Sequence, residues 1–326
     1  MLPLVYVFHM MAQFIGRTYK CRNRGVEIMP LRFGITALEF RDVAGRVIVN
    51  GFPDFSRLDV VDVVRHAMSD EYSVIEITMD VKHIVPGSLT QESINRLVEL
   101  KEELGHSYTA HLPFWSLELA TFNEHVRKGS VDSIIEAVVL AKPLEPEAYV
   151  LHASGDLAAG FAEMKYDPKI VRLVSSFLAG FAAASIEDIV SRTEINPREL
   201  AIENVDFPYA ILREVVDDLD TSICFDTAHL LAEMSGTESV MEFYETHKDR
   251  IIEIHLQDAA RDDDETAVQE DHVALGQGKM GDKTLRELLL ELVKDKFDGP
   301  IIFELTMDEA RESLSHIKQV VPEALK

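Results

Sequence analysis

The chain is poor in cysteine, tryptophan and positive charge. Its 326 residues include two cysteines and one tryptophan, and 32 Lys and Arg stand against 57 Asp and Glu, for a formal charge of −25. Two cysteines are too few for a disulfide framework, so we expect a reducing, cytoplasmic setting. Proteins that bind duplex nucleic acid need clustered Lys and Arg, so we expect no such partner. A small anionic substrate held by metal ions stays compatible with this charge.

The N-terminal hydrophobic run of the sequence does not have the features of a membrane span or a signal peptide. The uncharged run 2–16 is shorter than the ~20 residues that span a bilayer, and it lacks the basic flank and cleavage site of a signal peptide. We therefore expect no membrane partner. We interpret residues 1–29 as an N-terminal extension, either disordered or the product of a start codon placed too early, and residues 30–326 as a single domain.

Short apolar segments alternate with amphipathic ones along the rest of the chain. The expected strands are Leu31–Leu38, Ser73–Thr78, Tyr108–Leu112, Ala148–His152, Leu200–Glu203, Ser222–Phe225, Ile251–Leu256 and Pro300–Leu305. The expected helices are Val60–Met68, 90–104, Val131–Ala141, Ile170–Arg192 (as two helices or one), Tyr209–Leu219, Val240–His247, Leu285–Val293 and Asp308–Val320. Residues 42–55 and 261–266 are expected to be loops.

Eight strand–helix units in succession predict an α/β protein with a (β/α)8 barrel and a parallel eight-stranded core. A doubly wound open sheet is the structural alternative. The segment after the first strand, "GITALEF", is not the G-x-G-x-x-G turn of a dinucleotide-binding fold.

Histidines and acids stand where most of these strands end. In chain order they are His111, His152, Glu203, Asp226 with His229, His255 with Asp258, and Glu304, and the stretch "EDHVALGQG" adds Glu270, Asp271 and His272. The C-terminal ends of all barrel strands meet at one face, so we expect these groups to converge there. Histidine and carboxylate are the usual ligands of Zn, Mn and Fe, and crowded buried carboxylates need cations to offset their repulsion. The pattern predicts a metal site.

The same ordered set resembles the endonuclease IV branch of the xylose isomerase-like TIM barrels over roughly residues 31–306. "HVALGQG" at 272–278 matches the His-x-x-x-Gly-x-Gly element of that branch. The resemblance implies two or three divalent metal ions, Zn or Mn. The first would be held by His111, His152 and Glu203. The second would share Glu203 and add Asp226, His255 and Glu304. The third would use His229, His272 and an acid, which is Glu270 here where the branch carries Asp, with Asp271 adjacent.

The resemblance also implies the function of a phosphodiesterase, with Glu203, Glu304, His229 and His272 as catalytic residues. "AIENVDFPYAIL", "AHLPFWSLELA" and "KPLEPEAYVLH" are similar to the cobamide-remodelling phosphodiesterases of this superfamily, which implies a corrinoid substrate and cleavage of its nucleotide loop. Phe114 and Trp115 are candidates for stacking on a planar substrate group. Asn204 and Asp258 are candidates for substrate binding, or for hydrogen bonds that fix the histidine tautomers.

Three alternatives stay open at this point. A sugar isomerase or epimerase would use one divalent metal and carry only the Glu–Asp–His–Glu subset of ligands. An abasic-site DNA endonuclease would share all of the ligands but would need a basic groove. A protein that binds metal or a corrinoid without catalysis would show no turnover. The sequence does not indicate an oligomeric state.

Overall fold

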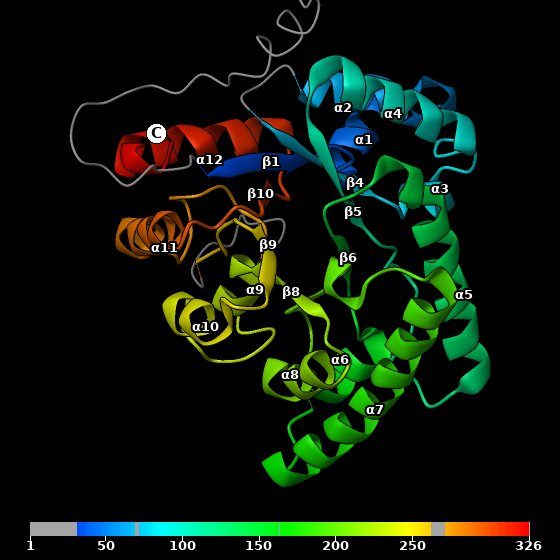
Figure 1. The fold of residues 1–326 in the computed structure, drawn as a ribbon, viewed down its shortest axis with the longest axis vertical. Coiled ribbons are helices and arrows are strands. Elements are labelled where there is room, and N and C mark those ends of the chain that lie inside the picture. Colours follow the sequence, from blue (N-terminus) through cyan, green and yellow to red (C-terminus); the bar gives the residue numbers. More distant parts are fainter. Residues whose placement is uncertain (1–30, 69–71, 163, 262–270, 326) are drawn as a thin grey trace, which may run out of the picture.

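The computed structural model describes residues 31–68, 72–162, 164–261 and 271–325 (Figure 1). The predictions for residues 1–29, for the charged loop after Arg261 and for Glu270 lie outside these ranges. Eight parallel strands close into a barrel in the order β1-β10-β9-β8-β7-β6-β5-β4. The barrel strands are β1 (Arg32–Thr36), β4 (Val74–Thr78), β5 (Ser107–His111), β6 (Tyr149–Leu151), β7 (Leu200–Glu203), β8 (Ser222–Asp226), β9 (Ile251–His255) and β10 (Pro300–Phe303). The predicted (β/α)8 barrel is confirmed.

Helices surround this barrel in Figure 1. They are α1 (Phe40–Val47), α2 (Val60–Ala67), α3 (Val81–Ile84), α4 (Gln91–Leu104), α5 (Glu124–Ala141), α6 (Asp156–Ala162), α7 (Pro168–Thr193), α8 (Tyr209–Asp218), α9 (Thr227–Leu231), α10 (Val240–His247), α11 (Gly281–Asp295) and α12 (Met307–Val320). Short 3-10 turns are η1 (Phe55–Arg57), η2 (Lys142–Leu144), η3 (Pro197–Glu199) and η4 (Pro322–Leu325).

Local sequence explains where several helices start and stop. Thr90 caps α4 through a reciprocal capping box with Ser93, and Gly105 ends that helix in the left-handed region with φ 71°. Asn123 caps α5, so this helix begins at Glu124, earlier than the predicted Val131.

The prediction of a loop over residues 42–55 was wrong. This segment forms α1 followed by an antiparallel hairpin of β2 (Ile48–Val49) and β3 (Phe52–Pro53). Asn50 and Gly51 connect the two short strands with φ values of 52° and 81°, and an Asn-Gly pair is a preferred hairpin connection. Val43 and Val47, four residues apart, are the buried side chains of α1.

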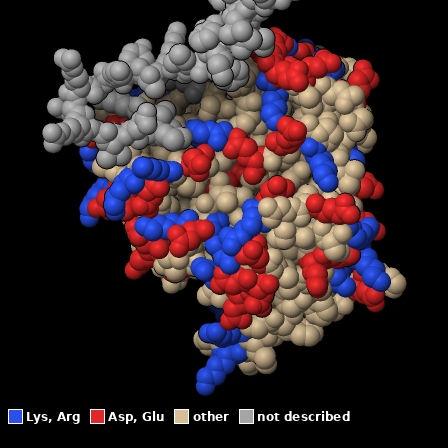
Figure 2. Space-filling model, viewed as in Figure 1, with Lys and Arg blue, Asp and Glu red and all other residues tan. Residues whose placement is uncertain are grey.

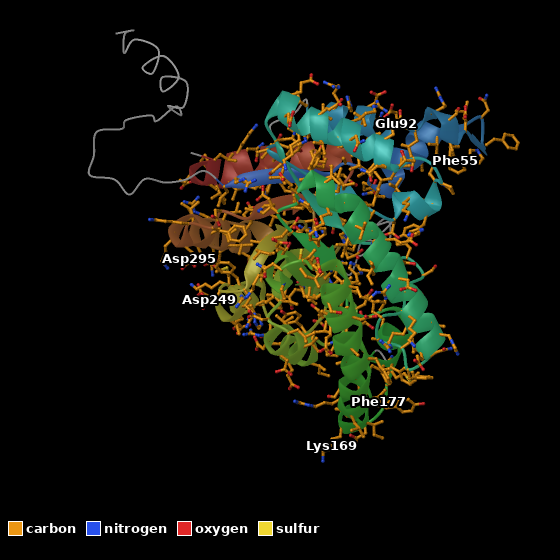
Figure 3. All side chains as sticks on the ribbon, turned by 45° about the vertical axis from the view of Figure 1, so that its right-hand side comes forward. Phe55, Glu92, Lys169, Phe177, Asp249 and Asp295 are labelled. Carbon is orange, nitrogen blue, oxygen red and sulfur yellow. The ribbon has the colours of Figure 1, made fainter. Side chains whose placement is uncertain are left out.

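The segment predicted as two helices or one is a single 26-residue helix, α7. Its first turns project beyond the barrel, where Figure 3 labels Lys169 and Phe177. By length and composition alone α7 could cross a membrane, with a mean hydropathy of 1.6 in its most apolar window. Its contacts with α5 and α8 are those of an outer barrel helix. On the face shown in Figure 2, Lys and Arg side chains are scattered among Asp and Glu without forming a continuous basic patch.

Inside the barrel, alternate side chains of each strand point into the lumen. Gly34 on β1 lets its neighbours pack closely, because a Cβ there would lie 2.6 Å from both the Ile302 side chain and the Val74 carbonyl oxygen. Small side chains on or directly before β6, β7 and β8 pack together as a separate buried group, Ala148, Val150, Ala201 and Cys224. The polar groups described next lie at the C-terminal ends of the same strands.

Candidate metal centre

The predicted ligands occupy the C-terminal rim of the barrel. His111, Glu203, Asp226 and His255 are the last residues of β5, β7, β8 and β9. His152 and Glu304 follow directly after β6 and β10, and His229 lies in the short helix α9. The structure therefore brings together groups that are far apart in the chain, and all of them are buried or nearly so.

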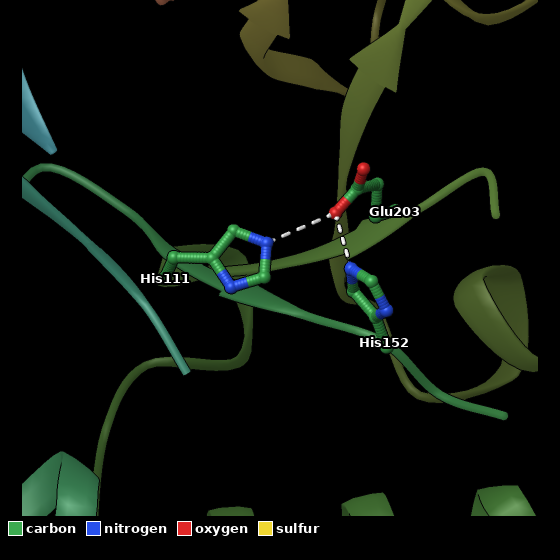
Figure 4. Close-up of side chains that lie close together, drawn as sticks. All are labelled: His111, His152 and Glu203. Atoms are coloured by element: carbon green, nitrogen blue, oxygen red, sulfur yellow. Dashed lines mark ion pairs between the residues drawn. The ribbon is translucent and has the colours of Figure 1, made fainter. Parts of the chain in front are cut away.

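The first group consists of His111, His152 and Glu203 (Figure 4). The Nε2 atoms of His111 and His152 lie 3.3 and 2.9 Å from Glu203 Oε2. His111 Nδ1 lies 3.0 Å from the carbonyl oxygen of Leu112, so with an N–H at Nδ1 the Nε2 atom can either carry a proton that faces Glu203 or give its lone pair to a metal ion. One ligand atom from each residue lies within 4.8 Å of the others, which matches the first predicted ligand set.

The second group shares Glu203 and adds Asp226, His255 and Glu304, as predicted. His255 Nδ1 lies 2.9 Å from Glu304 Oε2, 3.5 Å from Glu203 Oε1 and 3.8 Å from Asp226 Oδ2. The Asp226 side chain also accepts a hydrogen bond from the His229 backbone N–H at 2.7 Å and so caps α9. The capping bond fixes the direction of one carboxylate oxygen and leaves the other beside the histidine.

The third group contains Asp226, His229 and His272. His229 Nδ1 lies 3.1 Å from Glu203 Oε1. Among the described residues, the acid between the two imidazoles is Asp271, whose Oδ2 is 3.1 Å from His272 Nδ1 and 3.5 Å from His229 Nε2. Glu270, the acid named from the resemblance, lies outside the described ranges.

Opposite charges control protonation across the cluster. Burial alone would lower the pKa of His111, but the Glu203 carboxylate and its neighbours raise it to about 10. Burial opposes a similar rise at His272, where Asp271 and Glu304 raise the pKa to about 10. Burial would raise the pKa of Glu203, yet the surrounding imidazoles bring it well below the usual value. Protons on the histidines thus offset the carboxylates, and divalent cations can take the place of these protons.

Unpartnered polar atoms indicate that the cluster fits metal ions. Both carboxylate oxygens of Glu203, both ring nitrogens of His255 and the Nδ1 atoms of His229 and His272 are buried without a hydrogen bond of acceptable geometry. Such atoms are rare in folded proteins unless an ion or water satisfies them. Imidazole nitrogens and carboxylate oxygens are also the donor set that Zn and Mn prefer. The residues present therefore fit the predicted ions.

The two aromatic candidates lie beside this cluster. The Phe114 ring stacks on the His152 ring with centroids 4.5 Å apart, and its backbone N–H donates to Asp80 at 3.1 Å. Trp115 is 48% exposed, its backbone N–H also donates to Asp80, and its ring lies 5.6 Å from that of Phe40. Phe114 packs against the candidate ligand His152, whereas the Trp115 side chain is partly exposed to solvent.

Asn204 and Asp258 occupy supporting positions away from the cavity. Asn204 donates to the Asp226 carbonyl oxygen at 2.9 Å and accepts from the Asp226 backbone N–H at 2.7 Å. Asp258 accepts from the backbone N–H groups of Gly278 and Met280 at 3.0 and 2.8 Å. Neither lines the cavity, so their positions do not support substrate contact. Each instead fixes a segment that carries a candidate ligand.

Three residues near the centre were missed by sequence reasoning. Gln257 Nε2 donates to Asp226 Oδ2 at 2.6 Å and lies 3.3 Å from Glu304 Oε2, so it spaces two ligand carboxylates. Glu76 and Glu253 are fully buried within β4 and β9. The signal was present in the strand sequences "VIEIT" and "IIEIH", where a single acid interrupts β-branched residues in a buried strand.

A cavity of about 740 Å³ opens above the cluster. His111, His152, Glu203 and Glu304 are part of its polar wall. The other wall is apolar and comes from α1, the β2–β3 hairpin, α3 and the loop after β5; it includes Phe40, Val47, Phe55, Ile84 and Trp115. Figure 3 shows Phe55 at the periphery of the molecule.

A parallel eight-stranded barrel with histidines and carboxylates gathered at the C-terminal strand ends is typical of enzymes that use divalent metals. The family model described as xylose isomerase-like TIM barrel matches residues 64–320, and the chain belongs to this family. The predicted superfamily is therefore confirmed.

The relatives of this chain extend over most of its length. "Uncharacterized protein MJ1311" of Methanocaldococcus jannaschii is 24% identical over 302 residues, which cover 88% of each chain. A structure described as a D-tagatose 3-epimerase-like protein has a TM-score of 0.65 and 20% identity, with 90% of this chain and 98% of that chain covered. The TTHB071 protein of Thermus thermophilus, soaked with ZnCl2, has a TM-score of 0.57 and 19% identity, with 90% and 99% covered. At these identities the solved structures show the fold alone.

Proposed function

We propose that this protein is a metal-dependent phosphodiester hydrolase with two or three divalent ions, Zn or Mn, that acts on a small substrate. The observation that carries the proposal is the position of Glu203. Its Oε2 faces His111 and His152, while its Oε1 faces His229 and His255. A carboxylate with imidazoles at both oxygens is placed to join neighbouring ions, and a single-metal site needs no such arrangement.

Metal ions bound in these groups would lower the pKa of a water molecule and would bind the phosphate oxygens of the substrate. Glu304 is 14% exposed in its side chain while Glu203 is fully buried, so Glu304 is the better placed of the two to accept a proton from the attacking water. The P–O bond to the leaving group breaks as the new P–O bond forms. In a site with two ions, His229 and His272 hold no metal; both line the same cavity, and either protonated imidazole can give its proton to the departing oxygen.

The cavity limits the substrate. Among the described residues that line it, none is Lys or Arg, so beyond the metal ions and the histidines a substrate with several phosphates would meet no cationic side chain. The apolar wall favours a substrate in which one phosphodiester adjoins a bulky, planar or apolar group. The nucleotide-loop phosphodiester of a cobamide has this combination and is our best candidate, with Trp115 as the residue that stacks on it.

A sugar epimerase is the second candidate, favoured by two observations. Glu203, Asp226, His255 and Glu304 form a complete one-metal group, and the solved structures with this fold include sugar epimerases. In this reaction Glu203 or Glu304 would remove a proton from a substrate carbon and return one to it. The apolar cavity wall and the extra imidazoles around Glu203 are not needed for it.

His152→Ala separates these candidates. It removes a member of the first group and leaves the epimerase group intact. We expect one fewer bound metal equivalent and a loss of hydrolysis of bis(p-nitrophenyl) phosphate or of a complete corrinoid by on the order of 100-fold or more. Unchanged metal content together with ketohexose epimerisation would refute the hydrolase and support the epimerase. Tight metal binding by the wild-type protein with turnover in neither assay would favour a binding protein.

Glu203→Gln tests the joining carboxylate itself, with Glu99→Gln on the exposed face of α4 as a matched control. We expect Glu203→Gln to lose metal and activity together and the control to keep both. Full metal content and activity in Glu203→Gln would contradict the proposed role.

A further inference from the structure

A second layer of polar groups lies in the barrel lumen beneath the rim. Glu76 on β4 and Glu253 on β9 are fully buried, and one oxygen of each lies within 4.8 Å of a ring nitrogen of His255. Both oxygens of Glu253 and Oε2 of Glu76 lack a hydrogen bond in this arrangement. The proposed chemistry uses neither acid, so the burial of two carboxylates in the lumen needs a physical reason.

The two nitrogens of His255 face different partners. Nδ1 points to the rim, 2.9 Å from Glu304 Oε2, while Nε2 points down the lumen, 3.3 Å from Glu76 Oε2. A neutral imidazole has one N–H and one lone pair. If Nδ1 carried the hydrogen, it could not serve as a ligand at the rim, so the hydrogen must be held at Nε2.

Glu76 is oriented to hold that hydrogen. Thr36 Oγ1 on the neighbouring strand β1 donates to Glu76 Oε1 at 2.6 Å. This bond occupies one carboxylate oxygen and turns the other toward His255. At 3.3 Å the Nε2–Oε2 pair is longer than a strong hydrogen bond, and the Cys224 thiol also interacts with the His255 ring, but neither atom of the pair has a hydrogen bond of good geometry to another described residue.

We propose that Glu76 is a positioning residue that fixes His255 in the Nε2–H form and so aims the Nδ1 lone pair at the second ligand group. This inference rests on the proposed function, because it assumes that His255 is a ligand there. Carboxylates that accept the distal N–H of a ligating histidine fix its orientation and strengthen its binding. Thr36 acts through Glu76 in the same chain of contacts.

A cation held in the lumen by Glu76, Glu253 and His255 is the competing explanation. It would need the Nε2 lone pair, which would put the hydrogen on Nδ1 and take His255 away from Glu304 and Asp226. The rim places three carboxylates within 3.8 Å of Nδ1, whereas Nε2 faces Glu76 alone at 3.3 Å, so the geometry favours the hydrogen at Nε2.

The test uses the full chain loaded with Zn, labelled with 15N at histidine. In the wild type we expect His255 to show a ligated Nδ1 and a hydrogen-bonded Nε2–H in long-range proton–nitrogen correlations. In Glu76→Gln the Nε2 proton should move upfield, and competition with a chromophoric chelator should show about 10- to 100-fold weaker binding of one metal equivalent. Thr36→Val should shift both readouts in the same direction by less. Tyr108→Phe, which deletes a buried hydrogen bond to the Leu97 carbonyl oxygen elsewhere on β5, should lower stability and leave both unchanged.

Each failure has its own signature. If Nδ1 of His255 binds no metal in the wild type, the second ligand group proposed above is wrong. A ligated Nδ1 whose Nε2–H and metal affinity do not respond to Glu76→Gln would overturn the role of Glu76. Loss of one full metal equivalent in Glu76→Gln and Glu253→Gln, with His255 ligated through Nε2, would assign the lumen to a cation and likewise overturn it.

Discussion

Removal of metal should lower the thermal stability of this barrel by a large and calculable amount. Glu203, Asp226 and Glu304 converge on His255, and the first two carboxylates are fully buried. An ion present at roughly 1,000 times its dissociation constant stabilises the folded state by about 4 kcal/mol, so two ions give about 8 kcal/mol. With an unfolding entropy of about 2.1 cal/mol/K per residue over roughly 300 residues, this corresponds to a fall in Tm of about 13 °C.

The assay is calorimetry on protein with a verified metal content, before and after chelation and again after metal is restored. Glu203→Gln should have a low Tm that chelation no longer changes, because the shared ligand is gone. Glu99→Gln should respond as the wild type does. A Tm that stays within about 2 °C on complete metal removal would refute the reasoning that cations make the crowded carboxylates tolerable.

Three further predictions concern the cavity wall, the loop after β9 and acid stability. Trp115→Ala should raise KM by about 2- to 10-fold with kcat and metal content unchanged, which is the effect of one lost stacking contact; an unchanged KM would remove Trp115 from the substrate wall. In Gly278→Ala the new Cβ would lie 2.0 Å from the Ala259 carbonyl oxygen and 2.4 Å from Asp258 Oδ1. Because such overpacking strains the loop, the variant should lose about 1–3 kcal/mol of unfolding free energy in urea and bind metal more weakly at the third group. A normal unfolding free energy would show that the loop relaxes freely. Burial lowers the pKa of His106 from 6.5 to about 4, so the unfolded state binds the extra proton between these two values and stability falls as the pH drops through that window. His106→Gln should reduce this loss between about pH 7.5 and 5 by on the order of 1 kcal/mol, and an identical pH dependence would contradict it.

Much of the fold and of the rim could be predicted from the sequence because the signals are local. Each barrel strand is a short apolar run, and His111, Glu203, Asp226 and His255 stand where such runs stop. Strand ends converge in any parallel barrel, so chain position alone was enough to assemble the rim.

The remaining features depend on contacts that chain position does not reveal. Glu76 and Glu253 lie inside strands, and their meeting across the lumen requires the register of β4 and β9 around the barrel. The helix α1 was missed although Asn50 and Gly51 mark the hairpin after it, because its eight residues bury only Val43 and Val47. Asp271 was named only as a neighbour of Glu270, and its place between His229 and His272 is set by the folded loop.

The apolar wall of the cavity has a consequence for how this architecture diversifies. Much of it comes from residues 40–55, an insert between β1 and α2 that supplies none of the candidate ligands. Replacement of residues 40–55 by a segment of different shape or polarity would change which compound fits the cavity, and the candidate ligands would stay in place. Substitutions in residues 40–55 can therefore alter which compound the cavity accepts without altering the candidate ligands.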